Sequence, residues 1–108
     1  MTKLVCDFRF EDHTYVVLAD FYRRDVHGIE AVSTNKGPRA AEVKDHCATV
    51  GALLAGGMCI DVLAGLTKIG PIDAAIVACV VRARDRAQAS IATAPSERAT
   101  KMIAGDPL

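Results

Sequence analysis

The chain has 108 residues, with 13 Lys and Arg balanced by 13 Asp and Glu, so that its formal net charge is zero. Hydrophobic residues make up 51% of it, aromatic residues only 5%, and there is no Trp. This composition argues against a disordered chain and against a basic protein that coats nucleic acid. The longest apolar run, residues 72–81, is interrupted by Asp73 and is far shorter than the roughly 20 residues that span a bilayer. We therefore expect one domain and no membrane partner.

The first 34 residues carry the signature of three strands. Residues 3–10 alternate between apolar and polar, which predicts a half-buried strand after which residues 11–13 turn. Residues 14–21 have apolar side chains on both faces, which predicts a central strand. A polar turn over residues 22–28 and a short third strand over residues 28–34 complete an antiparallel meander.

A first helix is predicted from Pro38 onwards. Pro suits the first turn of a helix because its missing N–H removes no hydrogen bond there. Apolar residues at helical spacing then form one stripe over residues 40–54. Gly56 and Gly57 predict the stop, because glycine accepts the left-handed conformation that ends helices.

Two further helices follow. A short one over residues 60–67 places Ile60, Leu63 and Leu66 on its apolar side. The third begins at Pro71 and is predicted to end at residue 94, because Pro95 cannot donate a main-chain hydrogen bond.

Together the elements predict an α+β fold, a three-stranded antiparallel meander followed by three helices packed on one face. We expect a single domain over residues 1–94 and a polar C-terminal tail over residues 95–108, with room for one short helical turn. The small sheet leaves open edges, and small domains often cover such edges by self-association. A homodimer is therefore expected.

The chain has four cysteines, Cys6, Cys47, Cys59 and Cys79. No apolar signal segment opens the sequence, so we expect a cytoplasmic protein with reduced, buried thiols. The alternative is a metal site that uses Cys47, Cys59 and Cys79. Structural zinc sites usually take two ligands from one C-x₂₋₄-C turn, whereas eleven residues separate Cys47 from Cys59.

Motifs for ordinary enzymatic chemistry are missing from the sequence. His46 and Cys47 are adjacent, but neighbouring residues of a helix point about 100° apart and cannot act on one another. The loop with Lys36, Gly37 and Arg39 is a candidate anion-binding site, because cations and free N–H groups at a helix start can hold a phosphate. Its alternative is an ordinary solvated connection.

Arginine residues gather in two places: the pair Arg23-Arg24, and the three alternate residues Arg82, Arg84 and Arg86. Asp25 and Asp85 lie among them, and no aromatic side chain is interleaved as a stacking platform. We therefore expect solvated surface rather than a nucleic-acid interface.

Several short motifs follow one another in a fixed order along residues 8–85. They are His13-Thr14-Tyr15-Val16-Val17, Gly28-Ile29-Glu30-Ala31-Val32, Lys44-Asp45-His46-Cys47-Ala48-Thr49-Val50-Gly51-Ala52-Leu53-Leu54, Gly57-Met58-Cys59-Ile60-Asp61-Val62-Leu63 and Gly70-Pro71-Ile72-Asp73-Ala74-Ala75-Ile76. In pattern and order they resemble the TSCPD domain, a small module at the C-terminal end of vitamin B12-dependent (class II) ribonucleotide reductases that also occurs as a stand-alone protein. The naming motif itself is replaced, with Gly70 at the place of its cysteine and Pro71 retained.

The resemblance implies an accessory or interaction module that works with a ribonucleotide reductase or another partner in nucleotide metabolism. In the full reductase a separate barrel domain carries the radical chemistry, the adenosylcobalamin site and the active-site cysteines. We therefore expect this chain to hold no cofactor and to catalyse no ribonucleoside-diphosphate reduction by itself. The alternative function is a small regulatory domain that binds a nucleotide or another anion at the loop with Lys36, Gly37 and Arg39.

Overall fold

Alternating apolar and polar residues build a three-stranded antiparallel sheet in the first third of the chain. The computed structural model describes residues 2–66 and 68–101. Strands β1 (Thr2–Phe10), β2 (His13–Tyr22) and β3 (Asp25–Ala31) pair in the order β1-β2-β3. The central position predicted for the second strand is thus confirmed.

Both hairpin turns have only two residues. Phe10 pairs with His13, and Tyr22 pairs with Asp25. The residues between them, Glu11-Asp12 and Arg23-Arg24, all have positive φ, between 50° and 71°. Two consecutive residues of positive φ match the right-handed twist of the flanking strands. The long turn predicted over residues 22–28 is therefore wrong, and β3 begins at Asp25.

The same strand also ends earlier than the sequence predicts, at Ala31 rather than residue 34. The chain turns away after Val32, whose N–H donates to Val16 O at 3.3 Å. The side chain of Asn35 then completes the ladder. Its Oδ1 accepts from Val16 N at 2.9 Å and its Nδ2 donates to Val16 O at 3.0 Å. A side-chain amide here replaces the next residue of the strand.

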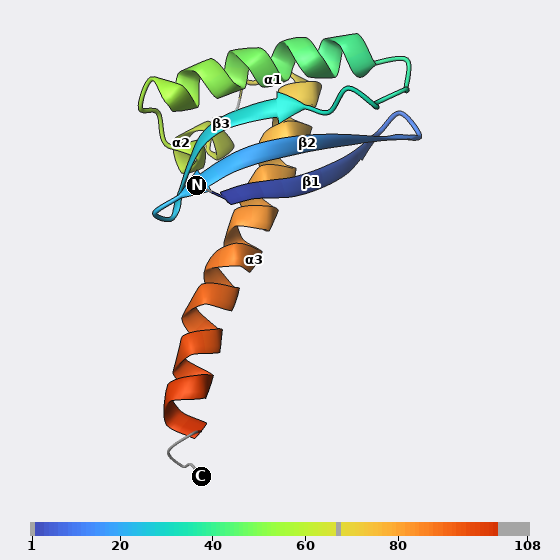
Figure 1. Ribbon diagram of the computed structural model, residues 1–108. Helices are drawn as coiled ribbons and strands as arrows, with labels where there is room; N and C mark the ends of the chain where they lie inside the picture. Colours follow the sequence, from blue (N-terminus) through green and yellow to red (C-terminus); the bar gives the residue numbers. More distant parts are fainter. Residues whose placement is uncertain (1, 67, 102–108) are drawn as a thin grey trace.

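Three helices follow the sheet, α1 (Ala40–Ala55), α2 (Ile60–Ala64) and α3 (Pro71–Lys101). Helix α1 packs on β3 and α3 packs on β1, while α2 contacts α3. Figure 1 shows α1 running alongside β3, while α3 crosses behind the strands and continues well beyond β1. The predicted α+β fold is confirmed.

Two helix ends differ from their predicted positions. Helix α2 stops at Ala64, because Gly65 caps it with hydrogen bonds to the preceding carbonyls. Helix α3 passes through Pro95 and continues to Lys101, although the sequence predicts an end at residue 94. Pro95 removes one main-chain hydrogen bond, whereas the Ala, Arg and Glu residues around it are strong helix formers. The rest of the predicted tail, residues 102–108, lies outside the described residues.

The core lies between the sheet and the helices. At its centre Tyr15 and Val17 of β2 and Val43 of α1 are fully buried. Helix α1 approaches the sheet most closely at Gly51, where a Cβ atom would lie 2.9 Å from Ile29 O. Within the described residues, no helix is both long enough and apolar enough to cross a membrane.

The turn at Arg23-Arg24 gives a direct test of the hairpin geometry. A residue other than glycine costs about 1–2 kcal/mol in the left-handed region. Arg24→Gly should therefore raise the free energy of unfolding by about 1 kcal/mol in urea titrations. The hydrogen bond that Gln88 donates to Arg24 O uses only the main chain of Arg24, so the substitution preserves it. Arg24→Ala keeps a Cβ atom in the same left-handed conformation, so it should leave the free energy of unfolding nearly unchanged.

Candidate functional site

The loop that leads into α1 is fastened to the sheet by Tyr15. The backbone N–H of Arg39 donates to Tyr15 Oη at 3.0 Å. Gly37 lies against the same side chain so closely that a Cβ atom there would overlap the phenol ring and its hydroxyl. One N–H group at the helix start is thus engaged by a buried hydroxyl.

The Arg39 side chain of the candidate anion site is already held by two carboxylates. Its Nε lies 2.8 Å from Glu11 Oε1 and its Nη1 lies 2.6 Å from Glu42 Oε1. These contacts raise the pKa of Arg39, and the Arg39 guanidinium lowers the pKa of Glu11 below its usual range. Lys36 is exposed nearby and makes no ion pair with any described residue. Of the two cations predicted for this site, the geometry therefore leaves Lys36 available.

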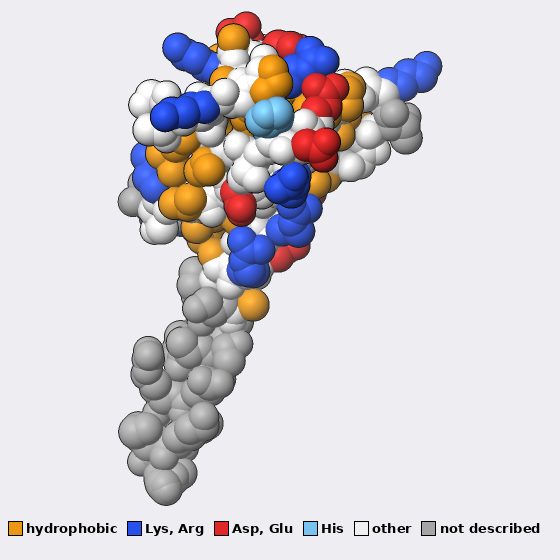
Figure 2. Space-filling view, turned by 90° about the vertical axis from the view of Figure 1, so that its right-hand side faces the viewer, with side chains coloured by type: hydrophobic (Ala, Val, Ile, Leu, Met, Phe, Trp, Pro, Cys, Tyr) orange, Lys and Arg blue, Asp and Glu red, His pale blue; other side chains and the backbone are white. Residues whose placement is uncertain are grey.

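Charges of both signs are also intermixed at the surface around this region. Figure 2 shows Lys and Arg side chains interspersed with Asp and Glu side chains over the face that it draws. Such mixing creates no broad positive field of the kind that attracts polyanions.

His46 faces Asp73 rather than a cysteine. Its Nδ1 lies 2.7 Å from Asp73 Oδ1, and this contact joins α1 to the first turn of α3. Cys47 is 1% exposed and points into the core. The pair is therefore separated as the helical geometry predicts, and His46 contributes to helix packing.

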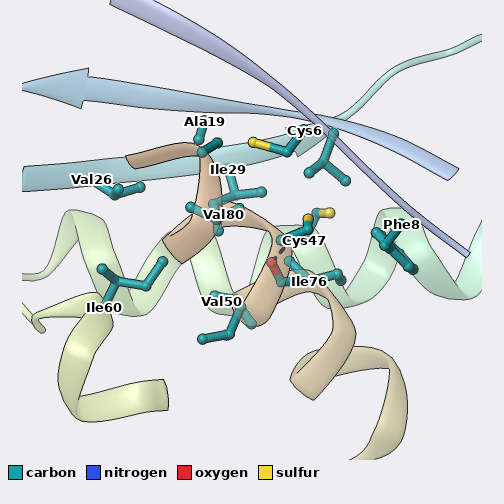
Figure 3. Close-up of a cluster of buried hydrophobic side chains, with 14 of the residues drawn as sticks. Cys6, Phe8, Ala19, Val26, Ile29, Cys47, Val50, Ile60, Ile76 and Val80 are labelled. Atoms are coloured by element: carbon teal, nitrogen blue, oxygen red, sulfur yellow. Dashed lines mark hydrogen bonds between the residues drawn. The ribbon is translucent and has the colours of Figure 1, made fainter. Parts of the chain in front are cut away.

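Three of the four thiols are buried in the core. Cys6 and Cys47 lie between the sheet and the helices, among Ile76, Val80 and other apolar side chains (Figure 3). Burial raises the pKa of the Cys47 thiol to about 12, with a smaller effect of the Asp73 charge. The hydrogen bond with the Cys6 thiol, together with burial, raises the pKa of Cys79. Cys47 and Cys79 are therefore poor nucleophiles at neutral pH, whereas the hydrogen bond with Cys79 lowers the pKa of the buried Cys6 thiol.

The expectation of buried thiols is wrong for Cys59, because this residue lies at the start of a short helix that leaves its side chain outside the core. It is exposed just before α2, and its Sγ donates to Asp61 Oδ2 at 3.6 Å. The three cysteines considered as metal ligands are thus divided between core and surface. Among residues 2–66 and 68–101, no group of three or more His, Cys, Asp or Glu side chains is placed to hold a metal ion.

The most distinctive surface feature surrounds α2. Four of the six large hydrophobic residues recorded as exposed lie between residues 53 and 66, and we call them the α2 patch: Leu53, Met58, Val62 and Leu66. Val62 is 56% exposed and Leu66 is 49% exposed. Val62 lies on α2, whereas Met58 precedes this helix and Leu66 follows it.

This patch corrects one expectation from the sequence. Leu66 was expected on the buried stripe with Ile60 and Leu63, but α2 ends at Ala64 and leaves Leu66 outside it. Next to the patch, a shallow apolar groove of about 210 Å³ lies between α2 and α3, lined by Ala64, Leu66, Ile69, Ala74, Val77 and Ala78.

A two-pronged ion pair fixes α2 against α3. Arg84 of α3 donates from Nη1 and Nη2 to the two carboxylate oxygens of Asp61, at 2.8 and 2.9 Å. The Arg84 side chain is only 11% exposed, although Asp61 is more open. The guanidinium lowers the pKa of Asp61. The helix that carries Val62 is therefore held against α3.

Comparisons with models of protein families, with curated proteins and with solved structures found no match to this chain. Functional assignment accordingly starts from the residues and their geometry.

Thiol labelling tests the division of the cysteines. A disulfide reagent at pH 8 should modify one thiol of the native protein rapidly, that of Cys59. Cys47 should stay protonated because its pKa is about 12. The other three thiols should react only after denaturation, and Cys59→Ser should remove the fast phase. Rapid reaction of two or more thiols in the native protein would contradict the burial described above.

The ion pair between Asp61 and Arg84 predicts a pH dependence. A carboxyl whose folded-state pKa is lowered adds stability above its unfolded pKa and loses this contribution as pH falls through the folded pKa. Asp61→Asn should therefore lower the free energy of unfolding at pH 7 by about 1 kcal/mol or less, since Asp61 is exposed. At a pH below the folded-state pKa, variant and wild type should unfold together, as followed by circular dichroism. A difference that persists in acid would show that packing, not charge, carries the effect.

Proposed function

We propose that this chain is an accessory interaction module without catalysis of its own, which acts as a homodimer and docks on a ribonucleotide reductase of the vitamin B12-dependent type. The observation that carries the proposal is the α2 patch. It concentrates exposed apolar side chains on one short segment, whereas an exposed apolar patch in a folded domain commonly marks a docking surface.

The form of the surface suits protein recognition. The α2 patch borders a groove, and the Asp61–Arg84 ion pair holds α2, which carries Val62, against α3. Exposed apolar side chains next to a shallow depression can be buried when a partner binds. Arg39 and His46 are engaged in structural contacts, which agrees with a binding role.

The reductase as partner rests on the resemblance to the TSCPD domain. The resembling motifs extend over residues 8–85 and include the segment Gly57 to Leu63, from which two residues of the α2 patch come. The partner would supply the cofactor and the radical chemistry, and this chain would supply a binding surface. A cytoplasmic location follows from the same assignment.

The competing function, anion binding, has less support. Arg39 is neutralised by Glu11 and Glu42, and its N–H is taken by Tyr15. Inorganic phosphate or a nucleotide at this loop would have to rely on Lys36. If such ligands raised the melting temperature and Lys36→Ala removed the effect, this second function would replace the first.

Direct binding tests the proposal. Purified vitamin B12-dependent ribonucleotide reductase from the same cells is immobilised, and the full chain is passed over it. We expect binding that Val62→Asp weakens about ten-fold or more, because a charge would be buried in the interface. Val62 is exposed, so the variant should keep its circular dichroism spectrum and melting temperature.

A matched control places the same charge elsewhere. Ala41→Asp adds a carboxylate to the exposed side of the first turn of α1, twelve residues before Leu53, and should leave the affinity unchanged. Binding no stronger than that of an unrelated protein, or equal loss in both variants, would overturn the proposed docking surface.

A further inference from the structure

Strand β1 is an uninterrupted edge strand of the described sheet. It pairs only with β2 in the described sheet, and its nine residues keep one regular register without a bulge. Its sequence from Thr2 to Phe10 contains neither Pro nor Gly. Long regular edges of this kind are open to pairing with another strand, and natural proteins block them when pairing is unwanted.

Of the charged side chains of β1, one forms ion pairs within the chain and two do not. The face of β1 that points away from the helices carries every second residue of the strand, namely Lys3, Val5, Asp7 and Arg9. Lys3 is held by Asp20 at 2.6 Å and by Glu30 at 3.0 Å. Within the described residues, Asp7 and Arg9 are exposed and form no ion pair. Two unpaired charges of opposite sign thus stand two residues apart near one end of β1.

We propose that a second copy of this chain adds to the β1 edge in antiparallel direction, with Phe8 opposite Phe8 of the partner subunit. Directly opposed residues in such a pair lie on the same face of the sheet. This register places Asp7 opposite Arg9 of the partner subunit, and the two-fold axis repeats the contact. On the helix side, Cys6 comes opposite Phe10 of the partner subunit, and Phe10 is only partly buried in one copy alone.

Neighbouring registers are less favourable. If the partner strand slides by two residues toward the start of β1, Asp7 comes opposite Asp7 of the partner subunit. A slide by two more residues places Lys3 opposite Arg9 of the partner subunit. Both juxtapose like charges, which destabilises strand pairs. One further shift would bring Lys3 to Asp7 of the partner subunit, but Lys3 is already neutralised by Asp20 and Glu30.

The course of α3 supports the same choice. Gln88 of α3 donates to Arg24 O in the β2–β3 turn, and Phe21 at that end of the sheet pairs with Thr2. The helix thus leaves the sheet near the start of β1, and Figure 1 shows it continuing beyond the strand. Centred on Phe8, the partner's strand lies beside the second half of β1. Each α3 then passes beyond the end of the other sheet, and a continuous six-stranded sheet can form.

Sedimentation equilibrium tests this interface, and charge exchange tests the register. The wild-type chain should be a dimer at micromolar concentrations. Asp7→Arg and Arg9→Asp should each weaken dimerisation about ten-fold or more, because each brings like charges together in both contacts. An equimolar mixture of these two variants should recover a heterodimer, since one carries only basic and the other only acidic side chains at the site.

The double variant Asp7→Arg/Arg9→Asp exchanges the charges and should dimerise like the wild type. Lys44→Glu, an exposed change on α1, is the matched control and should have no effect. A monomeric wild type would overturn the dimer, and a dimer that both single variants leave intact would overturn the β1 interface. Circular dichroism confirms that each variant is folded.

This inference rests on the homodimer in the proposed function but uses a different surface from the α2 patch. Loss of the dimer in the charge variants with retained reductase binding would support both assignments separately. Failure of the reductase to bind, with dimerisation behaving as described, would remove the partner and keep the interface.

Discussion

The close approach of α1 to β3 at Gly51 is the contact on which the rest of the structure depends. No side chain fits between the helix and Ile29 O, so the helix lies directly on the backbone of the strand. This proximity buries Val43, Cys47 and Val50 against the sheet. Close-packed cores respond to added volume with strain or backbone shifts. The position of α1 in turn fixes the loop before it and the α2 segment after it.

The polar contacts around α1 serve this placement. Tyr15 accepts the N–H of Arg39 at the beginning of the helix, and His46 contacts Asp73 in its middle. At its end, Gly57 takes a φ of 105° and turns the chain toward α2. Residue types that suggest an anion site or a nucleophile with its base are here used to hold helices on a sheet. The same chemistry serves stability, because a buried polar group needs a partner.

The two proposed binding surfaces lie on different elements. The α2 patch is apolar and belongs to the helical layer, whereas the β1 edge offers main-chain hydrogen bonds and the free charges of Asp7 and Arg9. A dimer built through β1 would present two α2 patches at once. Two linked sites raise the apparent affinity for a dimeric or repetitive partner without any new contact. This arrangement suits a small module that contributes binding rather than chemistry.

The sequence by itself determined the element types, the central place of β2 and the burial of Cys47 and Cys79, because alternation and helical spacing are local patterns. It misplaced the bounds of β3, the end of α3 and the exposure of Leu66, and it left the role of Arg39 open. These features depend on partners distant in sequence: Asn35 completes the ladder at Val16, and Arg39 meets Glu11 across 28 positions. Only the tertiary structure brings such residues together, so only it decided which charges are engaged and which apolar side chains stay exposed.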